Sequence, residues 1–231
     1  MFIRSLLFNI TFWAWIGFLG LGGLPLCLVY PPFAFAVGRA WGRGSLWLLR
    51  VLCGITHEVR GREHIPAGAA IIASKHQSAW DTIIFWTLFK RPAYVLKREL
   101  IYFPVFGWYL MLLKNIYINR KSGTAAMKRM LREAELLARE DRTLIIFPEG
   151  TRTLPGANVT YQPGTAALYQ HLKLPVVPVA LNSGRLWQKN AFVKKPGVIT
   201  IEFLENITPG LKNRDFMAKL QNVIEEKCQK L

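Results

Sequence analysis

The feature that most constrains this chain is a long uncharged run near its N-terminus. No Asp, Glu, Lys, Arg or His occurs from Ser5 to Gly38, a run of 34 residues. A helix needs about 20 apolar residues to cross the hydrocarbon core of a bilayer, so the run is long enough to span. Its end is marked by Pro31-Pro32, which stops a helix. Its second half also contains residues that weaken a helix: Gly17, Gly20, Gly22, Gly23 and Pro25.

A second apolar stretch, 33–53, differs from the first because it carries arginines. Arg39, Arg43 and Arg50 alternate there with Trp41 and Trp47. Tryptophan and arginine together are typical of the headgroup layer of a membrane. We therefore expect residues 1–54 to form a membrane-associated segment, with a helix, a proline corner and a second amphipathic helix. The arginines after the run predict that the remainder of the chain lies in the cytoplasm.

Several arrangements of this segment stay open. The helix pair either dips into one leaflet or forms a tight hairpin, and a single true span is the competing reading. A secretory signal cleaved after Ala34-Phe35-Ala36 is disfavoured, because the apolar region before it is too long and has only Arg4 as its positive charge. A buried pair of helices in a soluble protein is the least specific alternative.

Charge and composition narrow the class of protein. The 231 residues carry 30 Lys and Arg against 14 Asp and Glu, a net charge of +16, and 52% are hydrophobic. A chain this apolar buries enough surface to fold, which excludes a disordered protein. The positive charge favours an anionic partner, and a membrane surface suits the apolar content better than nucleic acid does. Cys27, Cys53 and Cys228 are too few and too scattered for a disulfide framework, so a reducing compartment is expected.

Strands and helices alternate over residues 55–231, which predicts an α/β domain with a mostly parallel sheet flanked by helices. The apolar stretch that ends at Leu113 is helical and is interrupted at Pro104. Strands are expected at 55–61, 69–73, 94–96, 115–118, 143–147, 176–181 and 198–203. Helices are expected at 78–88, 122–137, 163–172 and 215–227, with Ser78 and Ser122 as N-terminal caps.

The first candidate site is the pair His76 and Asp81. Positions five apart do not share a face of a helix, so His76 should lie in the loop before the helix and Asp81 in its first turn. The carboxylate then accepts a hydrogen bond from one ring nitrogen and holds the imidazole in one tautomer, and the other nitrogen acts as a base. One His with one Asp is weak evidence by itself, since both residue types also serve as helix caps.

The second candidate site is Phe147-Pro148-Glu149-Gly150-Thr151-Arg152, at the end of another buried strand. Ligands of open α/β sheets bind beyond the carboxyl ends of the strands, so Glu149, Thr151 and Arg152 are expected to project from that edge. An arginine there suits a phosphate, because its guanidinium bonds two oxygens at once. Two further strand ends present Lys97 and Arg120. Together these cations and His76 describe a base beside a phosphate cradle.

These motifs resemble, in order and spacing, the four blocks of the glycerolipid acyltransferases, and within that family the bacterial branch that acylates 1-acyl-sn-glycerol 3-phosphate. The resemblance covers about residues 74–182 and rests on four matches: His76 with Asp81, 116–120, 147–152 and 176–179. One departure is Lys75, where the family more often has Asn. The neighbouring cation is expected either to alter the surroundings of His76 or to help hold an anionic substrate.

The resemblance implies transfer of a fatty acyl group from a thioester to the sn-2 hydroxyl of lysophosphatidate at the bacterial inner membrane, with the catalytic domain in the cytoplasm. His76 would be the general base and Asp81 would orient it. Backbone N–H groups near Ser78 would stabilise the oxyanion. No cofactor and no metal are implied. The residues implied to bind the glycerol phosphate are Glu149, Gly150, Thr151, Arg152, Arg120 and Lys97.

Other functions stay open on the sequence alone. The acceptor is lysophosphatidate, another lysolipid such as a lyso-aminolipid, or glycerol 3-phosphate. The donor is acyl-coenzyme A or acyl-carrier protein, and both are acidic enough to suit the basic residues Lys128, Arg129, Lys194 and Lys195. A non-enzymatic basic membrane or nucleic-acid binder is a different class, although no nucleic-acid motif occurs. A metal hydrolase using His57, His64, His76 and Asp81 lacks the usual ligand spacing.

Overall fold

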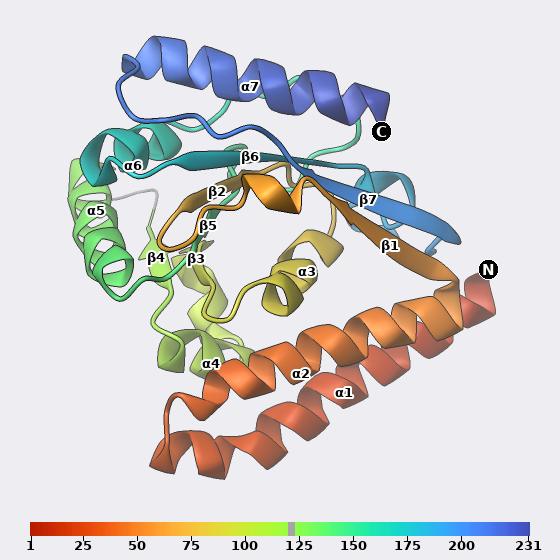
Figure 1. The fold of residues 1–231 in the computed structure, drawn as a ribbon. Coiled ribbons are helices and arrows are strands. Elements are labelled where there is room, and N and C mark those ends of the chain that lie inside the picture. Colours follow the sequence, from red (N-terminus) through yellow and green to blue (C-terminus); the bar gives the residue numbers. More distant parts are fainter. Residues whose placement is uncertain (120–122) are drawn as a thin grey trace.

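The computed structural model describes residues 1–119 and 123–231, so Arg120 and Ser122 lie outside the described residues. Two long helices come first, as expected. Helix α1 (Phe2–Val29) runs through Pro25, the residues at Pro31 and Pro32 turn the chain, and α2 (Phe33–Leu48) returns beside α1. Figure 1 shows the two helices side by side along one side of the molecule. The glycines of α1 therefore do not end the helix.

A seven-stranded sheet forms the centre of the α/β domain. Its order is β1-β7-β6-β2-β5-β3-β4, and every neighbouring pair is parallel except β6 with β7. The prediction of a mostly parallel sheet is confirmed. The strands are β1 (Ile55–Arg60), β2 (Ile71–Ser74), β3 (Ala93–Lys97), β4 (Ile116–Ile118), β5 (Leu144–Ile146), β6 (Val176–Leu181) and β7 (Gly197–Phe203).

Helices cover both faces of the sheet (Figure 1). One face packs on α5, α6 and α7 through side chains such as Met130, Leu168 and Phe216. The other face packs on α3 and on the N-terminal helices through Trp80, Trp86 and others. The remaining helices are α3 (Trp80–Leu88), α4 (Phe106–Leu112), α5 (Gly123–Arg139), α6 (Gly164–Leu172) and α7 (Asn213–Lys230).

Helix α1 is attached to the domain at two places along its length. Near its start, the Arg4 guanidinium donates to the carbonyl of Leu52, and Ser5 Oγ accepts the backbone N–H of Lys194. Further along, Tyr109 Oη donates to the carbonyl of Gly20. Only 17% of the most apolar window of α1 is buried, and the helix is long and apolar enough to cross a membrane.

Lys194 was predicted from the sequence as one of the cations suited to an acidic acyl donor, and that interpretation was wrong. Its side chain is buried. The ammonium donates to Asn9 Oδ1 at 2.5 Å and lies over the rings of Phe8 and Trp187 at 5.3 and 5.2 Å. Lys194 therefore fixes α1 against the domain by cation–π contacts rather than meeting a ligand.

Candidate active site

The two candidate motifs meet at one edge of the sheet. Strands β2 and β5 are parallel neighbours, with Ala73 opposite Ile146. Because their carboxyl ends point the same way, the loop after Ser74 and the loop after Ile146 lie next to each other. The backbone N–H of Thr153 donates to the carbonyl of His76 at 2.8 Å, which joins the two loops directly.

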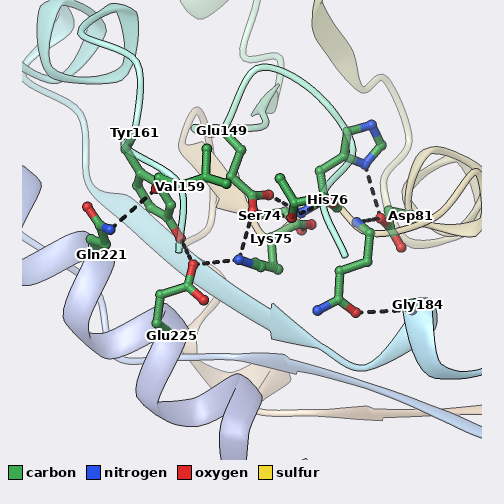
Figure 2. Close-up of polar contacts among 12 residues, drawn as sticks. Ser74, Lys75, His76, Asp81, Glu149, Val159, Tyr161, Gly184, Gln221 and Glu225 are labelled. Carbon is green, nitrogen blue, oxygen red and sulfur yellow. Dashed lines mark hydrogen bonds and ion pairs between the residues drawn. The ribbon is translucent and has the colours of Figure 1, made fainter. Parts of the chain in front are cut away.

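His76 and Asp81 form the hydrogen-bonded pair that their spacing predicts. His76 Nδ1 lies 3.0 Å from Asp81 Oδ2 (Figure 2). Asp81 sits in the first turn of α3 and is fully buried, while the His76 side chain is 12% exposed. A carboxylate only accepts, so in the neutral form of this imidazole Nδ1 carries the proton and Nε2 has the lone pair. The ring also stacks on Phe147, with centroids 3.9 Å apart, which fixes its plane.

Asp81 is held in place by donors on both of its oxygens. Besides the His76 ring, Oδ2 accepts the backbone N–H groups of Gln77 at 2.7 Å and Ser78 at 2.8 Å. The other oxygen, Oδ1, accepts Ser183 Oγ at 2.5 Å. Three neutral donors and the imidazole therefore offset the cost of burying this charge. A carboxylate in such a setting stabilises an imidazolium on His76 without itself moving.

Three of the backbone N–H groups near Ser78, where oxyanion donors were expected, are already occupied. The N–H groups of Gln77 and Ser78 bind Asp81, and the N–H of Trp80 donates to Ser78 Oγ at 3.2 Å. Ser78 therefore bonds the first residue of α3, but the N-cap position itself is Ala79, one residue later than predicted. This loop orients the base, and those three N–H groups are not free to meet a developing oxyanion.

Glu149 does not project from the sheet edge, so that expectation was wrong. Its side chain is buried and points back under the His76 loop (Figure 2). Oε2 accepts the backbone N–H of His76 at 2.7 Å, and Oε1 accepts Thr153 Oγ1 at 2.5 Å. Pro148 and Gly150 turn the chain sharply here, with Gly150 at φ 67°, and that turn sends the carboxylate inward. In this geometry Glu149 supports the backbone of the base.

Lys75 is also buried, which contradicts the idea that it helps hold an anionic substrate. Its side chain is 1% exposed, and Nζ lies 2.7 Å from Glu149 Oε1 and 2.6 Å from Glu225 Oε1. Burial alone would lower the pKa of Lys75, but the two carboxylates outweigh burial and the pKa is raised. The ammonium therefore stays charged inside the protein.

The other predicted binding residues follow the ends of neighbouring strands of the sheet. Thr151 is exposed and Arg152 half-buried, two and three positions after Glu149. Lys97 is exposed at the end of β3, the strand beside β5. Within the described part of the chain, no hydrogen bond or ion pair occupies the side chain of Arg152 or of Lys97, so both are available at this edge. Arg120 falls in the part of the chain that is not described.

Sequence reasoning missed four polar residues that complete the site. Ser183 follows the end of β6, so the same strand-end argument could have found it. Gln77 Oε1 accepts the N–H of Gly184 at 3.0 Å, which closes the loop after β6 over the His76 loop. Glu225 binds the ammonium of Lys75 and the hydroxyl of Tyr161. No motif near these residues predicts the contacts, because Glu225 lies 150 residues from Lys75 in the chain.

No three His, Cys, Asp or Glu side chains gather as a metal site within 1–119 and 123–231. His57, one of the residues considered for such a site, lies beside the Trp80 ring with centroids 6.0 Å apart. The groups that this edge offers for chemistry are an imidazole, its carboxylate and nearby cations.

Comparison with known proteins finds relatives of similar sequence. The protein is 42% identical over 165 residues to a 1-acyl-sn-glycerol-3-phosphate acyltransferase from Pseudomonas aeruginosa, a match that covers 71% of this chain and 64% of that one. It is 32% identical over 184 residues to the enzyme of the same name from Limnanthes alba, covering 79% and 65%. This chain thus spans slightly less than two thirds of the length of these relatives.

The fold is also found in a solved structure. The crystal structure of the 1-acyl-sn-glycerophosphate (LPA) acyltransferase PlsC from Thermotoga maritima superposes with a TM-score of 0.80 at 22% identity, covering 100% of this chain and 97% of that one. The sequence model of the Acyltransferase family matches residues 56–182, which include both site loops and most of the sheet. The chain belongs to the Acyltransferase family.

Proposed function

We propose that this protein transfers a fatty acyl group from an acyl thioester to the sn-2 hydroxyl of 1-acyl-sn-glycerol 3-phosphate, giving phosphatidate. The observation that carries the proposal is the His76–Asp81 pair, in which a fully buried, fully bonded carboxylate holds a partly exposed imidazole. The names of the relatives support the choice of acceptor.

The reaction follows from the tautomer. Nε2 of His76 takes the proton of the sn-2 hydroxyl as its oxygen attacks the thioester carbonyl carbon. The resulting tetrahedral oxyanion collapses, the carbon–sulfur bond breaks, and the imidazolium returns the proton to the leaving thiolate. Asp81 stabilises the imidazolium in between. The acyl group passes directly to the alcohol, so no covalent acyl-enzyme is needed.

The acceptor phosphate is assigned to the cations of the same edge. Arg152, with Thr151 and the backbone at Gly150, lies in the turn that follows the strand beside His76, and Lys97 ends the next strand. We assign Arg120 to the same phosphate from the family resemblance. A guanidinium that bonds two phosphate oxygens would place the hydroxyl for attack. The thioester donor is either acyl-coenzyme A or acyl-carrier protein.

The membrane segment places the site at the surface where its lipid substrate lies. Both attachments of α1 hold it along the domain rather than away from it, which supports insertion into one leaflet rather than a crossing. Its outward side chains are large and apolar, for example Phe18 at 71% and Val29 at 86% exposure. We assign the protein to the cytoplasmic face of the bacterial inner membrane, where the positive charge attracts anionic lipids.

The decisive experiment is a matrix of donors and acceptors with wild type and His76→Ala. Acyl-coenzyme A and acyl-carrier protein are each paired with lysophosphatidate, a lyso-aminolipid and glycerol 3-phosphate. We expect turnover with lysophosphatidate in the wild type and none above background in His76→Ala, with vesicle binding unchanged. His171→Ala, a surface histidine that pairs with Glu135, is the control. Near-normal turnover in His76→Ala would falsify the mechanism.

A further inference from the structure

The segment between β3 and β4 presents a second apolar surface next to α1. Four large side chains, which we call the 102–111 patch, are exposed there: Tyr102 at 69%, Phe103 at 58%, Trp108 at 42% and Met111 at 49%. They lie around α4, which Figure 1 places at the same side of the molecule as α1 and α2. Exposed apolar patches of this kind mark an interaction surface.

The patch is fixed to α1 by an interlocking contact. The Val105 side chain occupies the space that a Cβ at Gly20 would need. Tyr109 Oη donates to the Gly20 carbonyl at 3.0 Å and would also contact a Cβ at Gly23. Val105 has φ 62°, an unfavourable conformation for a β-branched residue, so packing against Gly20 holds the backbone in a strained state. The glycines of α1 thus form the notch that receives this segment.

We propose that the 102–111 patch is a second membrane-contacting element, which inserts into the same leaflet as α1. Three observations favour a lipid surface as the occupant. The patch belongs to a segment that packs on α1 at Gly20, between exposed Phe18 and Leu21. It contains Tyr and Trp, which prefer the headgroup boundary, and exposed Lys97 and Lys114 flank it in the sequence. The inference rests on the membrane attachment proposed above.

Site-specific fluorescence tests it. An environment-sensitive fluorophore is attached at Trp108→Cys, Phe18→Cys on α1 or Leu136→Cys on α5, each with Cys228→Ser because the other two cysteines are buried. With vesicles of phosphatidylethanolamine and phosphatidylglycerol, we expect blue-shifted emission at positions 18 and 108 and none at 136. A blue shift at position 18 without one at position 108 overturns the inference about the 102–111 patch but leaves the membrane attachment of α1 intact. No shift at either position overturns membrane attachment as well.

A different observation, the buried charges behind His76, carries a second inference. Glu225 on α7 accepts Lys75 Nζ at 2.6 Å and Tyr161 Oη at 2.9 Å (Figure 2). Lys75 in turn holds Glu149, whose other oxygen accepts the His76 N–H at 2.7 Å. Charged groups therefore run without a break from the C-terminal helix to the backbone of the base.

The chain of contacts is costly to interrupt. Lys75 and Glu149 are 1% and 0% exposed at their side chains, so either charge without its partner would be an uncompensated ion inside the protein. Both oxygens of Glu149 are committed, one to His76 and one to Lys75 and Thr153. A shift of Lys75 therefore moves Glu149, and with it the loop that carries His76.

We infer that Lys75 and Glu225 are positioning residues for acyl transfer, acting on His76 through Glu149. The inference rests on the proposed role of His76 as the base. It assigns a catalytic consequence to α7, which lies outside both site loops. Neither residue would contact substrate, so substitutions should change kcat rather than KM.

The test compares Glu225→Gln with Glu226→Gln, the adjacent residue of α7 whose exposed carboxylate pairs with Lys230. We expect Glu225→Gln to lower kcat severalfold with KM unchanged, and to shift the His76 ring signals in NMR spectra of histidine-labelled protein. Glu226→Gln should change neither. Lys75→Met, the more severe variant, should lower kcat by about 100-fold through displacement of the base.

Two results would overturn this second inference. One is a Glu225→Gln variant with unchanged kcat and unchanged His76 signals. The other is a lower unfolding temperature with normal kcat below it, which means a purely structural role. Near-normal turnover in the His76→Ala variant would instead count against the proposed function.

Discussion

The site edge and the N-terminal helices depart from the usual distribution of side chains in opposite directions. At the edge, charged groups are inside: Lys75, Asp81 and Glu149 are each at most 2% exposed. On α1, large apolar groups are outside, with Trp13 at 67% and Phe18 at 71% exposure. Both arrangements cost free energy in water, and each is offset by a particular partner. The partner of the buried charges is within the protein, whereas the partner that we propose for the exposed apolar groups is a lipid surface.

The most severe way to break the site is to alter its buried carboxylate. Asp81→Asn places an amide nitrogen among the N–H donors of Gln77, Ser78 and His76, so the imidazole loses its tautomer. We expect kcat to fall by about 10³- to 10⁴-fold while membrane binding persists. Steady-state kinetics with lysophosphatidate measure the change, and Asp215→Asn, at the exposed start of α7, is the matched control. An activity loss below tenfold would contradict the orienting role.

A milder change separates acceptor binding from the chemical step. Arg152→Ala removes a guanidinium from the turn beside His76. We expect the acceptor KM to rise by roughly 10- to 100-fold, the loss of a charge-assisted hydrogen bond, and kcat to change much less. Arg129→Ala, which removes an exposed ion pair on α5, should leave the acceptor KM unchanged. If Arg152→Ala leaves the acceptor KM at its wild-type value, the phosphate lies elsewhere.

The helical region can be tested by two glycines that lie close together on α1. A Cβ at Gly20 would overlap Val105, whereas nothing lies within 4 Å of a Cβ at Gly22. We expect Gly20→Ala to lower the free energy of unfolding by about 1–3 kcal/mol and Gly22→Ala to raise it by up to about 1 kcal/mol. Denaturation in detergent measures both. Equal changes in the free energy of unfolding at the two positions would mean that Val105 does not pack tightly against Gly20 of α1.

The smallest expected effect concerns alkaline pH. The folded protein holds the pKa of Lys75 above its ordinary value of 10.5. At pH values between 10.5 and this raised pKa, the folded state therefore binds more protons than the unfolded state. The ion pairs contribute their full stability below pH 10.5, and that contribution is lost as pH rises through the raised pKa. Urea titrations at increasing pH should show a steeper decline for wild type than for Lys75→Met. Parallel declines would show that the ammonium titrates normally.

The parts that sequence could predict are those fixed by local rules. The strand–helix alternation, the strand-end positions and the His76–Asp81 bond all depend on residues close together in the chain. The direction of Glu149 was not predictable, because a turn at Pro148 and Gly150 allows the side chain to face either way. The antiparallel β6–β7 pair also escaped prediction, since alternating apolar residues in a strand do not reveal its direction.

Long-range partners were the other limit. Nothing near Glu225 in the chain indicates that its carboxylate meets Lys75, and the glycines of α1 looked like weak points of a helix rather than a notch for Val105. In both cases the function of the residue is set by a neighbour that only the tertiary structure supplies. The same is true of Lys194, whose ammonium lies over the ring of Phe8, far away in the chain, as well as over that of Trp187.

The pairing of β1 with β7 has a consequence for how the protein is made. Ile55 aligns with Gly197, so the strand that follows the two N-terminal helices has no partner in the sheet until roughly 140 more residues have left the ribosome. At about 5–20 residues per second, the exposed apolar helix waits on the order of ten seconds before its domain can close. Early contact with the bilayer would shelter that helix during synthesis, so lipid would serve this enzyme as a folding aid before it serves as a substrate.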